Sequence, residues 1–454
     1  MEKSSTKDMT SGSPMKLILG FSIPLLFGFL FQQLYNIVNM VIVGRFLGVN
    51  ALAGVGSTGS VNFLIIGFCM GVCNGFAIPL AHKFGAKDFA GMRRFIANSV
   101  WLSALFAVAM TALTAIFCRP LLILMKTPEN IFADAYIYIF IIFLGIPATY
   151  LYNLLSGIIR AMGDSKTPLV FLTISSVLNI VLDLIFILVF GMGVAGAAIG
   201  TVVSQTVSGI MCLLFIRRFP MLRIEKEEWK IDLHHMVTLC NMGIPMGLQY
   251  SITAIGSVIL QSAVNSLGSG VVATVTAASR VSLFFCCPFD ALGAGMATYS
   301  GQNVGARKLD RLSAGVKASS VLGIIYSILA FFFLFFFGGH LSALFLDAGE
   351  THLLADARLF LIISSAFYIP LVFVNILRFT IQGMGFSTFA ILAGVCEMAA
   401  RTLAGILLVP AFGFVAACFA GPLAWIFADV FLFPAYIHVK KKLERMINSE
   451  QITS

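Results

Sequence analysis

Residues 169–201 read LVFLTISSVLNIVLDLIFILVFGMGVAGAAIGT, and this stretch decides the fold. Two long apolar runs flank the turn Gly191-Met192-Gly193. A helix that crosses a hydrocarbon core about 30 Å thick needs roughly 20 apolar residues, and both runs meet that length. The stretch therefore predicts two membrane-spanning helices, Leu169–Phe190 and Val194–Arg217.

The first of these helices carries a carboxylate in a hydrophobic setting. Asn179 and Asp183 are four residues apart, so they share one helix face. A charged side chain is costly in hydrocarbon and normally faces a cavity or a partner, where it marks an ion or proton pathway. The alternative is a hydrogen bond that only packs two helices together. We expect the pathway, because the surrounding residues are Ile, Val, Leu and Phe.

The composition indicates a polytopic membrane protein. The 454 residues are 59% hydrophobic and 11% charged, with a mean hydropathy of +0.98. Soluble domains have about 45–50% apolar and about 25% charged residues. The opening residues do not resemble a cleaved signal peptide. The nine Cys show no CxxC pair or disulfide spacing, so we interpret them as small buried hydrophobic residues.

The length rule predicts an all-α membrane protein of twelve transmembrane helices. Its divisions are an N-terminal six-helix lobe at 1–216, a linker at 217–236, a C-terminal six-helix lobe at 237–439 and a basic tail at 440–454. The linker is charged and is interpreted as a connection or an amphipathic surface helix. The expected spans are 16–43, 51–81, 95–118, 131–157, 168–190, 194–217, 237–264, 271–299, 314–337, 353–377, 387–410 and 413–438.

The two lobes repeat each other. A shift of 220 residues places Asn50–Arg93 on Gly270–Ser313, so that Gly85-Ala86-Lys87 meets Gly305-Ala306-Arg307. Six spans per half is an even number, so both halves enter the membrane from the same side. Pseudosymmetric bundles of this kind are typical of transporters, with the binding site near the membrane midplane.

Basic residues predict the orientation. Most of the 29 Lys and Arg fall on one side of the predicted spans, including those at 83–94, 217–230 and 307–317, Arg378 and the C-terminal tail. Positive residues accumulate in cytoplasmic loops, so we expect both termini in the cytoplasm and the protein in the cell membrane, the inner membrane where a cell has two. This distribution also explains the net charge of +9 without nucleic-acid binding.

No motif of a soluble enzyme is present in the sequence. There is no Walker A motif, so we expect no ATP hydrolysis and no enzymatic activity. His234 and His235 lie in the charged linker and are interpreted as surface residues. We expect no metal site and no cofactor beyond a transported ion.

The first span contains a stripe of polar side chains. Gln32, Asn36 and Asn39 share one helix face, and Tyr35 lies near it. Amides on one stripe either join helices or line a cavity, and we expect cavity lining.

Two prolines lie at matching positions of the repeat, Pro24 in the first span and Pro245 in the seventh. Proline frees a carbonyl and permits a bend, so both are candidate hinges.

The second half carries several intramembrane charges. Glu397 and Arg401 are four residues apart and are interpreted as a structural ion pair. Asp290 has Arg280 ten residues earlier as a candidate partner, and both are assigned structural roles. Asp429 has no evident partner in the sequence.

Five stretches over nearly the whole chain resemble the multidrug and toxic compound extrusion (MATE) transporters, in the branch of bacterial DinF-like and related drug exporters. These stretches are LYNIVNMVIVGRFLG (34–48), FGAKDFAGMRR (84–94), IIRAMGDSKTP (158–168), LNIVLDLIFI with GVAGAAIGT (178–201) and GQNVGARKLDR (301–311).

The resemblance implies a two-lobed bundle that exports amphipathic, mainly cationic drugs in exchange for protons or sodium by alternating access. It implies that Asn179, Asp183 and Thr201 match the ion-coupling cluster of that branch. The first-span acid of the cluster falls on Asn39, so this sequence keeps one titrating acid there.

We expect a substrate cavity in the N-terminal lobe. The candidate substrate-binding residues are Gln32, Tyr35, Asn36, Asn153, Ser176 and Gln205. Among the 43 Phe and 19 Met, the sequence does not select those that line the cavity. The alternative function is a flippase or exporter of a lipid-linked or other anionic precursor in the same superfamily. We expect small organic cations and the lipid bilayer as partners, and a monomer.

Overall fold

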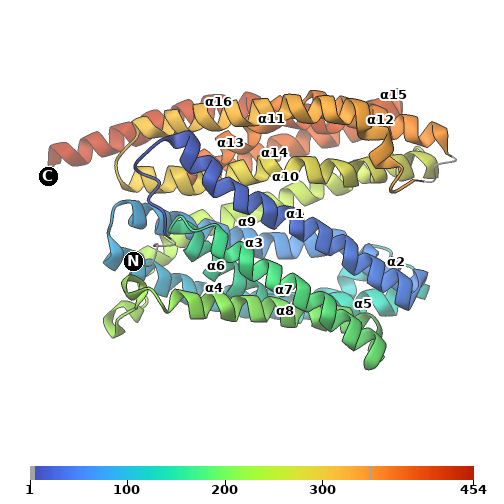
Figure 1. Cartoon of the computed structure of the whole chain (residues 1–454), viewed down its shortest axis with the longest axis horizontal. Helices are drawn as coiled ribbons and strands as arrows, with labels where there is room; N and C mark the ends of the chain where they lie inside the picture. Colours follow the sequence, from blue (N-terminus) through green and yellow to red (C-terminus); the bar gives the residue numbers. More distant parts are fainter. Residues whose placement is uncertain (1–5, 347–349, 454) are drawn as a thin grey trace. The chain divides into compact units, whose positions relative to one another are not determined.

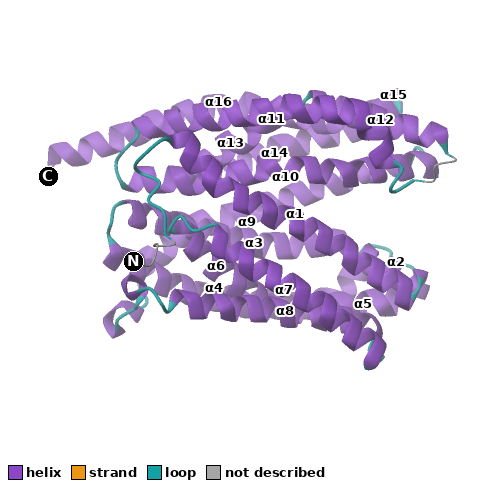
Figure 2. Ribbon diagram, in the orientation of Figure 1, coloured by secondary structure: helices purple, strands orange, loops and turns teal. Residues whose placement is uncertain are grey.

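The protein is built almost entirely of helices, as a computed structural model that describes residues 6–346 and 350–453 shows (Figure 2). Residues 1–5 of the expected N-terminal lobe and residue 454 of the expected tail lie outside this range. The α-helices, labelled in Figure 1, are α1 (Pro14–Leu47), α2 (Val49–Ser57), α3 (Gly59–Gly85), α4 (Phe89–Leu124), α5 (Glu129–Leu144), α6 (Ile146–Ala161), α7 (Lys166–Leu184), α8 (Gly193–Ile216), α9 (Leu233–Asn265), α10 (Ser269–Gly305), α11 (Asp310–Ser342), α12 (Thr351–Ala366), α13 (Tyr368–Gly383), α14 (Ser387–Leu403), α15 (Val409–Phe412) and α16 (Phe414–Thr453).

The helices supply the expected membrane spans. Ten helices in the described ranges are each long and apolar enough to cross a membrane. The pairs α5–α6 and α12–α13 are bent by 46° and 49°, and they raise the number to 12 when each pair counts as one span. The predicted twelve-span, all-α fold is confirmed. The expected span 51–81 was wrong in detail, because α2 ends at Ser57 and α3 begins at Gly59.

The chain forms two compact units. The first comprises Met1–Asp8 and Phe27–Ser251, and the second comprises Met9–Leu26 and Ile252–Ser454. The chain therefore passes from one unit to the other inside α1 and again inside α9. The lobes expected from sequence, 1–216 and 237–439, divide the chain at other residues, because a sequence does not reveal where a continuous helix changes its packing partners.

The backbone repeats the duplication seen in the sequence. Lys87 and Arg307, which are 220 positions apart, both have φ 58°, a left-handed conformation that is rare outside glycine. Gly193 and Gly413 show φ 60° and 61° at the same separation. The two helix-ending turns that match in sequence are therefore also built in the same way.

Two single-turn π-helices also recur. Ile185–Val189 follows α7 in the first unit, and Ala404–Leu408 follows α14 in the second. Short π-helical turns are rare and often mark functional positions. Each unit thus has one such turn near the end of the corresponding span.

The two units have separate apolar cores. The core of the first unit is large and draws on α3 to α6, α8 and the first half of α9. In the second unit, one cluster joins α11, α13, α14 and α16, and another joins α9, α10 and α16 near Val409. The nine cysteines are free thiols, and four of them, Cys69, Cys73, Cys118 and Cys212, are buried in the core of the first unit.

Glycines let α3 and the first half of α9 approach closely in the first unit. An added Cβ on Gly75 would lie 2.5 Å from the Cα of Gly243, and one on Gly71 would lie 2.5 Å from the carbonyl oxygen of Met246. Such distances are far inside van der Waals contact. Small residues four apart on both helices therefore set this crossing, as is common between membrane helices.

The linker folds onto α4. Glu228 accepts two hydrogen bonds from the Arg93 guanidinium, at 2.8 and 2.9 Å, and one from the backbone N–H of Glu225. Trp101 donates to the carbonyl of Trp229. The linker contains two short 3-10 turns, Pro220–Leu222 and Lys226–Trp229, so the amphipathic-helix alternative was wrong.

The residues just before α1 and the C-terminal part of α16 both contact the α10–α11 turn of the second unit. Lys308 donates to the carbonyl of Thr10, and Arg311 donates to that of Gly12. On α16, Lys440 donates to Ser313. The start of α1 and the end of α16 therefore lie on the same side of the unit, which an even number of spans requires.

We expect Gly75→Ala to destabilise the protein, because the added methyl group collides with the backbone of α9. Overpacking of this kind costs about 1–3 kcal/mol. Thermal unfolding in detergent measures the change. The matched control is Gly59→Ala, where nothing lies within 4 Å of the added atom. Equal melting temperatures for the two variants would contradict the assigned close approach.

We expect acid to release the linker from α4. The hydrogen bond from Arg93 lowers the pKa of the Glu228 carboxyl. A lowered pKa stabilises the folded form above the ordinary value of about 4.3, and this contribution is lost as the pH falls through the lowered value. Fluorescence of the Trp101–Trp229 pair should therefore stay constant from neutral pH to about pH 5 and change below it. Glu228→Gln should abolish the transition, and its persistence in that variant would refute the assignment.

Candidate functional site

A polar cluster lies inside the first unit, where α1, α7 and α8 each contribute side chains. Helices α7 and α8 run side by side and are joined by the predicted glycine turn (Figure 1). Asn179 and Asp183 on α7 are both buried, at 1% and 0% exposure. The i, i+4 spacing thus places both on the helix face that packs inside the unit.

Hydrogen bonds connect three of the helices through Thr201 on α8. Its hydroxyl donates to the carbonyl of Ala197 at 3.0 Å, which uses its one proton. It therefore accepts from Asn179 Nδ2 at 3.4 Å and from the Tyr35 hydroxyl at 3.2 Å. Tyr35 in turn accepts from Asn39 Nδ2 at 3.3 Å. The two hydroxyl protons in this chain are used, and each of the two amide groups donates one of these hydrogen bonds.

Several acceptor atoms of the same cluster have no hydrogen-bond partner among the described residues. Neither carboxylate oxygen of Asp183 has a hydrogen-bond partner within the described residues. The amide oxygens of Asn39 and Asn179 are also buried without a partner there. A buried charge without hydrogen bonds is costly. The two carboxylate oxygens and the two amide oxygens are acceptors, the kind of atom that a proton or a small cation needs.

The backbone is shaped to admit the carboxylate. An added Cβ on Gly200 would lie 2.2 Å from Asp183 Oδ1 and 3.5 Å from Asn179 Nδ2. The π-helical turn Ile185–Val189 begins two residues after Asp183. The charge of Asp183 also acts on the hydroxyls of Tyr35 and Tyr138. The acid thus lies between a glycine, two tyrosines and an irregular turn.

The other predicted substrate-binding residues lie in different surroundings. Gln205 accepts a hydrogen bond from Thr149 at 3.0 Å, and Asn153 donates to the Thr149 carbonyl at 2.8 Å, so these form a second polar group between α6 and α8. Ser176 donates to its own helix at Leu172. Gln32 is half-buried and Asn36 is exposed, and within the described residues neither is hydrogen-bonded to Asp183, Asn179 or Thr201.

A second set of charges lies inside the second unit. Glu397 accepts from Arg401 at 3.2 Å, as the sequence spacing predicted, and it also accepts from Arg378 on α13. Glu397 is 3% exposed and Arg378 is 7% exposed. The assignment of Arg378 to the cytoplasmic basic residues was therefore wrong, because its guanidinium is held inside the unit by Glu397.

The expected pairing of Arg280 with Asp290 is not formed. Both side chains are exposed on α10, and no ion pair joins them in the described part of the chain. Ten residues of helix separate their Cα atoms by about 15 Å, which is too far for a contact. The charge of Arg378 acts instead on Asp290 and on Asp429 of α16. The described residues contain no group of three or more metal-ligating side chains.

The same fold and duplication occur in known transporters. The MatE family model matches residues 24–185 and again 245–407, so both halves match separately. The chain belongs to the MATE family. A MATE fold accounts for the two bent helix pairs and for the repeated turns, because each half of the chain is one copy of the family unit.

The relatives of this chain are named for the transport of different compounds. The probable multidrug resistance protein YoeA of Bacillus subtilis is 30% identical over 75% of this chain and 75% of its own length. The FAD transporter of Shewanella oneidensis is 24% identical over 73% of this chain and 74% of its own length. A multidrug resistance MATE family transporter, solved in an outward-facing conformation, has a TM-score of 0.90 at 22% identity and covers 98% of this chain and 100% of its own.

Sequence reasoning missed three residues of this MATE protein's polar sites. Gly200 was visible only as one small residue of GVAGAAIGT, and Tyr138 as an aromatic residue in an apolar span. Arg378 was visible as a basic residue near a predicted span end. Its position 19 residues before Glu397 lies on the other side of a loop, so helical spacing gives no signal for their pairing.

We expect Gly200→Ala to abolish ion-coupled transport while the protein stays folded. The added methyl group occupies the position of Asp183 Oδ1 and must displace the carboxylate or the helix. Transport in proteoliposomes and the elution profile of the purified protein measure the two effects. Gly56→Ala is the matched control, because nothing lies within 4 Å of the atom added there. Unchanged coupling in Gly200→Ala would refute the close contact with Asp183.

Proposed function

We propose that this protein is a secondary active multidrug efflux antiporter in the cell membrane. It exports amphipathic, mainly cationic compounds in exchange for protons or sodium, and the coupling ion binds at Asp183. The observation that carries the proposal is the buried Asp183 carboxylate, which accepts no hydrogen bond from the described residues and belongs to a cluster with two further unpartnered amide oxygens. The family relationship supports export of drugs, since the relatives include a probable multidrug resistance protein.

The chemistry of the cluster supports a cation rather than an anion as its occupant. Asp183, Asn39 and Asn179 offer oxygen acceptors, and their neighbouring donors are already engaged by Tyr35 and Thr201. No Lys or Arg has an ion pair with Asp183 among the described residues. An anionic precursor has nothing to bind to here, which disfavours the flippase alternative for this site.

Asp183 can couple two ligands by competition. When it is ionised, its carboxylate attracts a cationic drug or a metal cation. When it holds a proton, the charge is cancelled and the drug loses its counter-ion. Proton uptake from outside would then release the drug, and proton loss to the cytoplasm would let the next drug bind. The hydrogen bonds of Thr201 and Asn179 hold the surrounding groups in place during this exchange.

The energetics depend on the number of charges exchanged. One proton against one monovalent cation moves no net charge, so the driving force is the pH gradient, about 1.4 kcal/mol per pH unit. Each further uncompensated charge adds about 2.3 kcal/mol per 100 mV of membrane potential. A single acid at the first-unit cluster favours the electroneutral exchange. We also propose that both termini face the cytoplasm and that the monomer is the working unit.

Asp183→Asn should abolish coupled export while the protein remains folded, because the amide can neither bind a proton nor carry the negative charge. Uptake of a fluorescent cationic dye into proteoliposomes, first under a pH gradient and then under a sodium gradient, measures coupling. Asp310→Asn, an exposed acid at the start of α11, controls for the loss of one negative charge.

The two gradients distinguish the possible results. Uptake driven by the pH gradient and lost in Asp183→Asn supports proton coupling at this acid. Uptake driven only by sodium and lost in the variant keeps the site and changes the ion. Active uptake retained by Asp183→Asn overturns the assignment of Asp183. If folded wild-type protein shows no uptake under either gradient, the cationic-drug function is wrong.

A further inference from the structure

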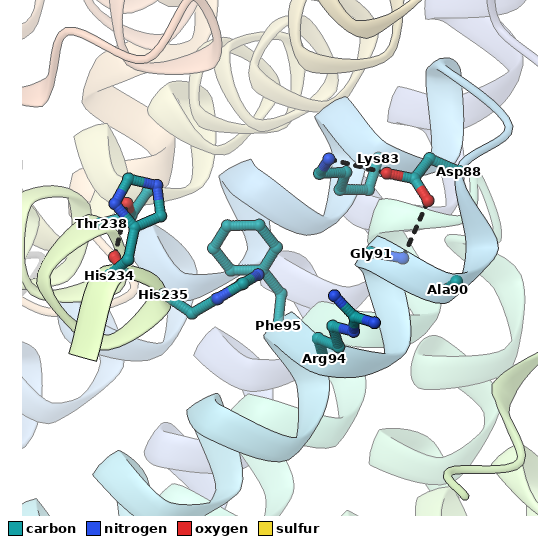
Figure 3. Close-up of a pocket in the computed structure, with 9 residues that line it drawn as sticks. All are labelled: Lys83, Asp88, Ala90, Gly91, Arg94, Phe95, His234, His235 and Thr238. Atoms are coloured by element: carbon teal, nitrogen blue, oxygen red, sulfur yellow. Dashed lines mark hydrogen bonds and ion pairs between the residues drawn. The ribbon is translucent and has the colours of Figure 1, made fainter. Parts of the chain in front are cut away.

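A hollow of about 490 Å³ lies at one end of the first unit, away from the Asp183 cluster. It is bounded by the last turn of α3, the first turns of α4 and the first turns of α9 (Figure 3). Its polar lining comes mainly from Lys83, Asp88, Arg94, His234 and His235. Binding pockets for small molecules commonly have volumes of about 300–1,000 Å³, so this one has room for a small polar group.

The acids at this hollow are already engaged. Asp88 Oδ2 accepts from Lys83 at 2.7 Å, and Oδ1 accepts from the backbone N–H of Gly91 at 2.8 Å. The hydrogen bond from Lys83 lowers the pKa of Asp88, so this carboxyl is ionised at neutral pH. Beside the hollow, Asp232 caps α9 through the His234 N–H and contacts the His235 ring at 2.7 Å.

Arg94 contributes a positive charge to the hollow that no carboxylate of the described residues pairs with. Its guanidinium lines the hollow and is exposed, and in the described ranges no carboxylate lies within ion-pair distance of it. The neighbouring Arg93 is instead held by Glu228. Arg94 thus presents donors to the hollow that a bound anion can use, and a guanidinium matches a phosphate in a bidentate way.

Two tryptophans mark the level of the membrane surface nearby. Trp101 on α4 and Trp229 in the linker pack edge to face and are 45% and 40% exposed. Exposed Trp residues gather at the membrane–water interface. Arg94 lies seven residues before Trp101, which is about 10 Å along the helix axis. The headgroup layer extends about 5–7 Å beyond the hydrocarbon on each side, so the flexible Arg94 side chain reaches its outer edge.

We propose that this hollow binds a phosphate group, presented by the headgroup of an anionic phospholipid, with Arg94 as its main charged contact. Basic pockets between membrane helices on the cytoplasmic side are suited to such headgroups. The bound phosphate would join the start of α4 to the start of α9, and therefore to the linker that ends there. This inference does not depend on the transport function proposed for Asp183.

The test measures lipid binding to the full-length protein in a zwitterionic detergent. Phosphatidylglycerol is titrated, with phosphatidylcholine, whose headgroup is zwitterionic and has no net charge, as the comparison, and the bound lipids are counted by native mass spectrometry. We expect Arg94→Gln to weaken the tightest phosphatidylglycerol site about fivefold, the effect expected for one basic residue near an anionic surface. Arg94→Lys should restore most of the affinity.

The matched control is Lys87→Gln, which removes an exposed positive charge from the same α3–α4 turn but does not line the hollow. Its affinity for phosphatidylglycerol should equal that of the wild type. Equal melting temperatures of the wild type and Arg94→Gln without added lipid show that the fold is intact. Equal weakening by Arg94→Gln and Lys87→Gln would indicate a general surface attraction and overturn the site.

A titration with inorganic phosphate separates the two sources of a phosphate group. Millimolar phosphate that fails to displace phosphatidylglycerol from the Arg94-dependent site supports the lipid headgroup. If inorganic phosphate binds in an Arg94-dependent way and phosphatidylglycerol does not, the lipid assignment is wrong. If Arg94→Gln changes neither titration, the hollow is not a phosphate site and the proposal fails.

Discussion

Hydrocarbon offers no hydrogen bonds to a buried carboxylate, so the protein itself must supply whatever stabilises the charge of Asp183. Among the described residues no donor is hydrogen-bonded to it, and Gly200 leaves space for its Oδ1 atom. Asn179 donates instead to Thr201, and Thr201 donates to the α8 backbone. The charge is therefore incompletely compensated by the fold, and a proton or a cation has to complete it.

The second unit shows the opposite solution on the same duplicated backbone. Its buried Glu397 is held by two guanidinium groups, Arg378 and Arg401. Removing one partner of such a group leaves an uncompensated charge, so the arrangement favours a fixed structure. The π-helical turn recurs in both units, while the charges before it differ. Duplication thus preserved the helices and turns while the side chains diverged: the buried acid of one unit is paired with arginines, and that of the other accepts no hydrogen bond from the described residues.

Most of the fold followed from sequence because lipid imposes simple rules. Spans need a minimum apolar length, and their backbone groups must be satisfied within a helix. The turn at Gly191–Gly193, the repeat and the pairing of Glu397 with Arg401 all depend on local spacing. The passage of α1 and α9 between two units did not follow, because the residues on either side of Leu26 or Ser251 are equally apolar. The break at Thr58 was missed for another reason: it lies in the small, polar run Gly56–Ser60, which the count of span length did not weigh.

The site could be predicted in part. Asn179, Asp183 and Thr201 are brought together as the family resemblance implied, and Tyr35 and Asn39 join them through hydrogen bonds. Gln32 and Asn36 share the sequence stripe of Asn39 but do not join, since the direction of a stripe depends on which helices pack against it. Gly200 was missed because its role is the absence of a side chain, which only the distance to Asp183 reveals.

Asn39, where the resemblance places an acid, sets the direction of the hydrogen bonds in the cluster. The resemblance places an acid at this position, and a carboxylate would accept a hydrogen bond from Tyr35. The amide donates to Tyr35 instead, so Tyr35 donates onward to Thr201 and Thr201 to the backbone of Ala197. A second acid would reverse the first of these bonds and add a second negative charge near Asp183. With Asn39, the hydrogen bonds from α1 run in one direction through Tyr35 and Thr201 to the α8 backbone, and Asp183 is the one carboxyl group of the cluster.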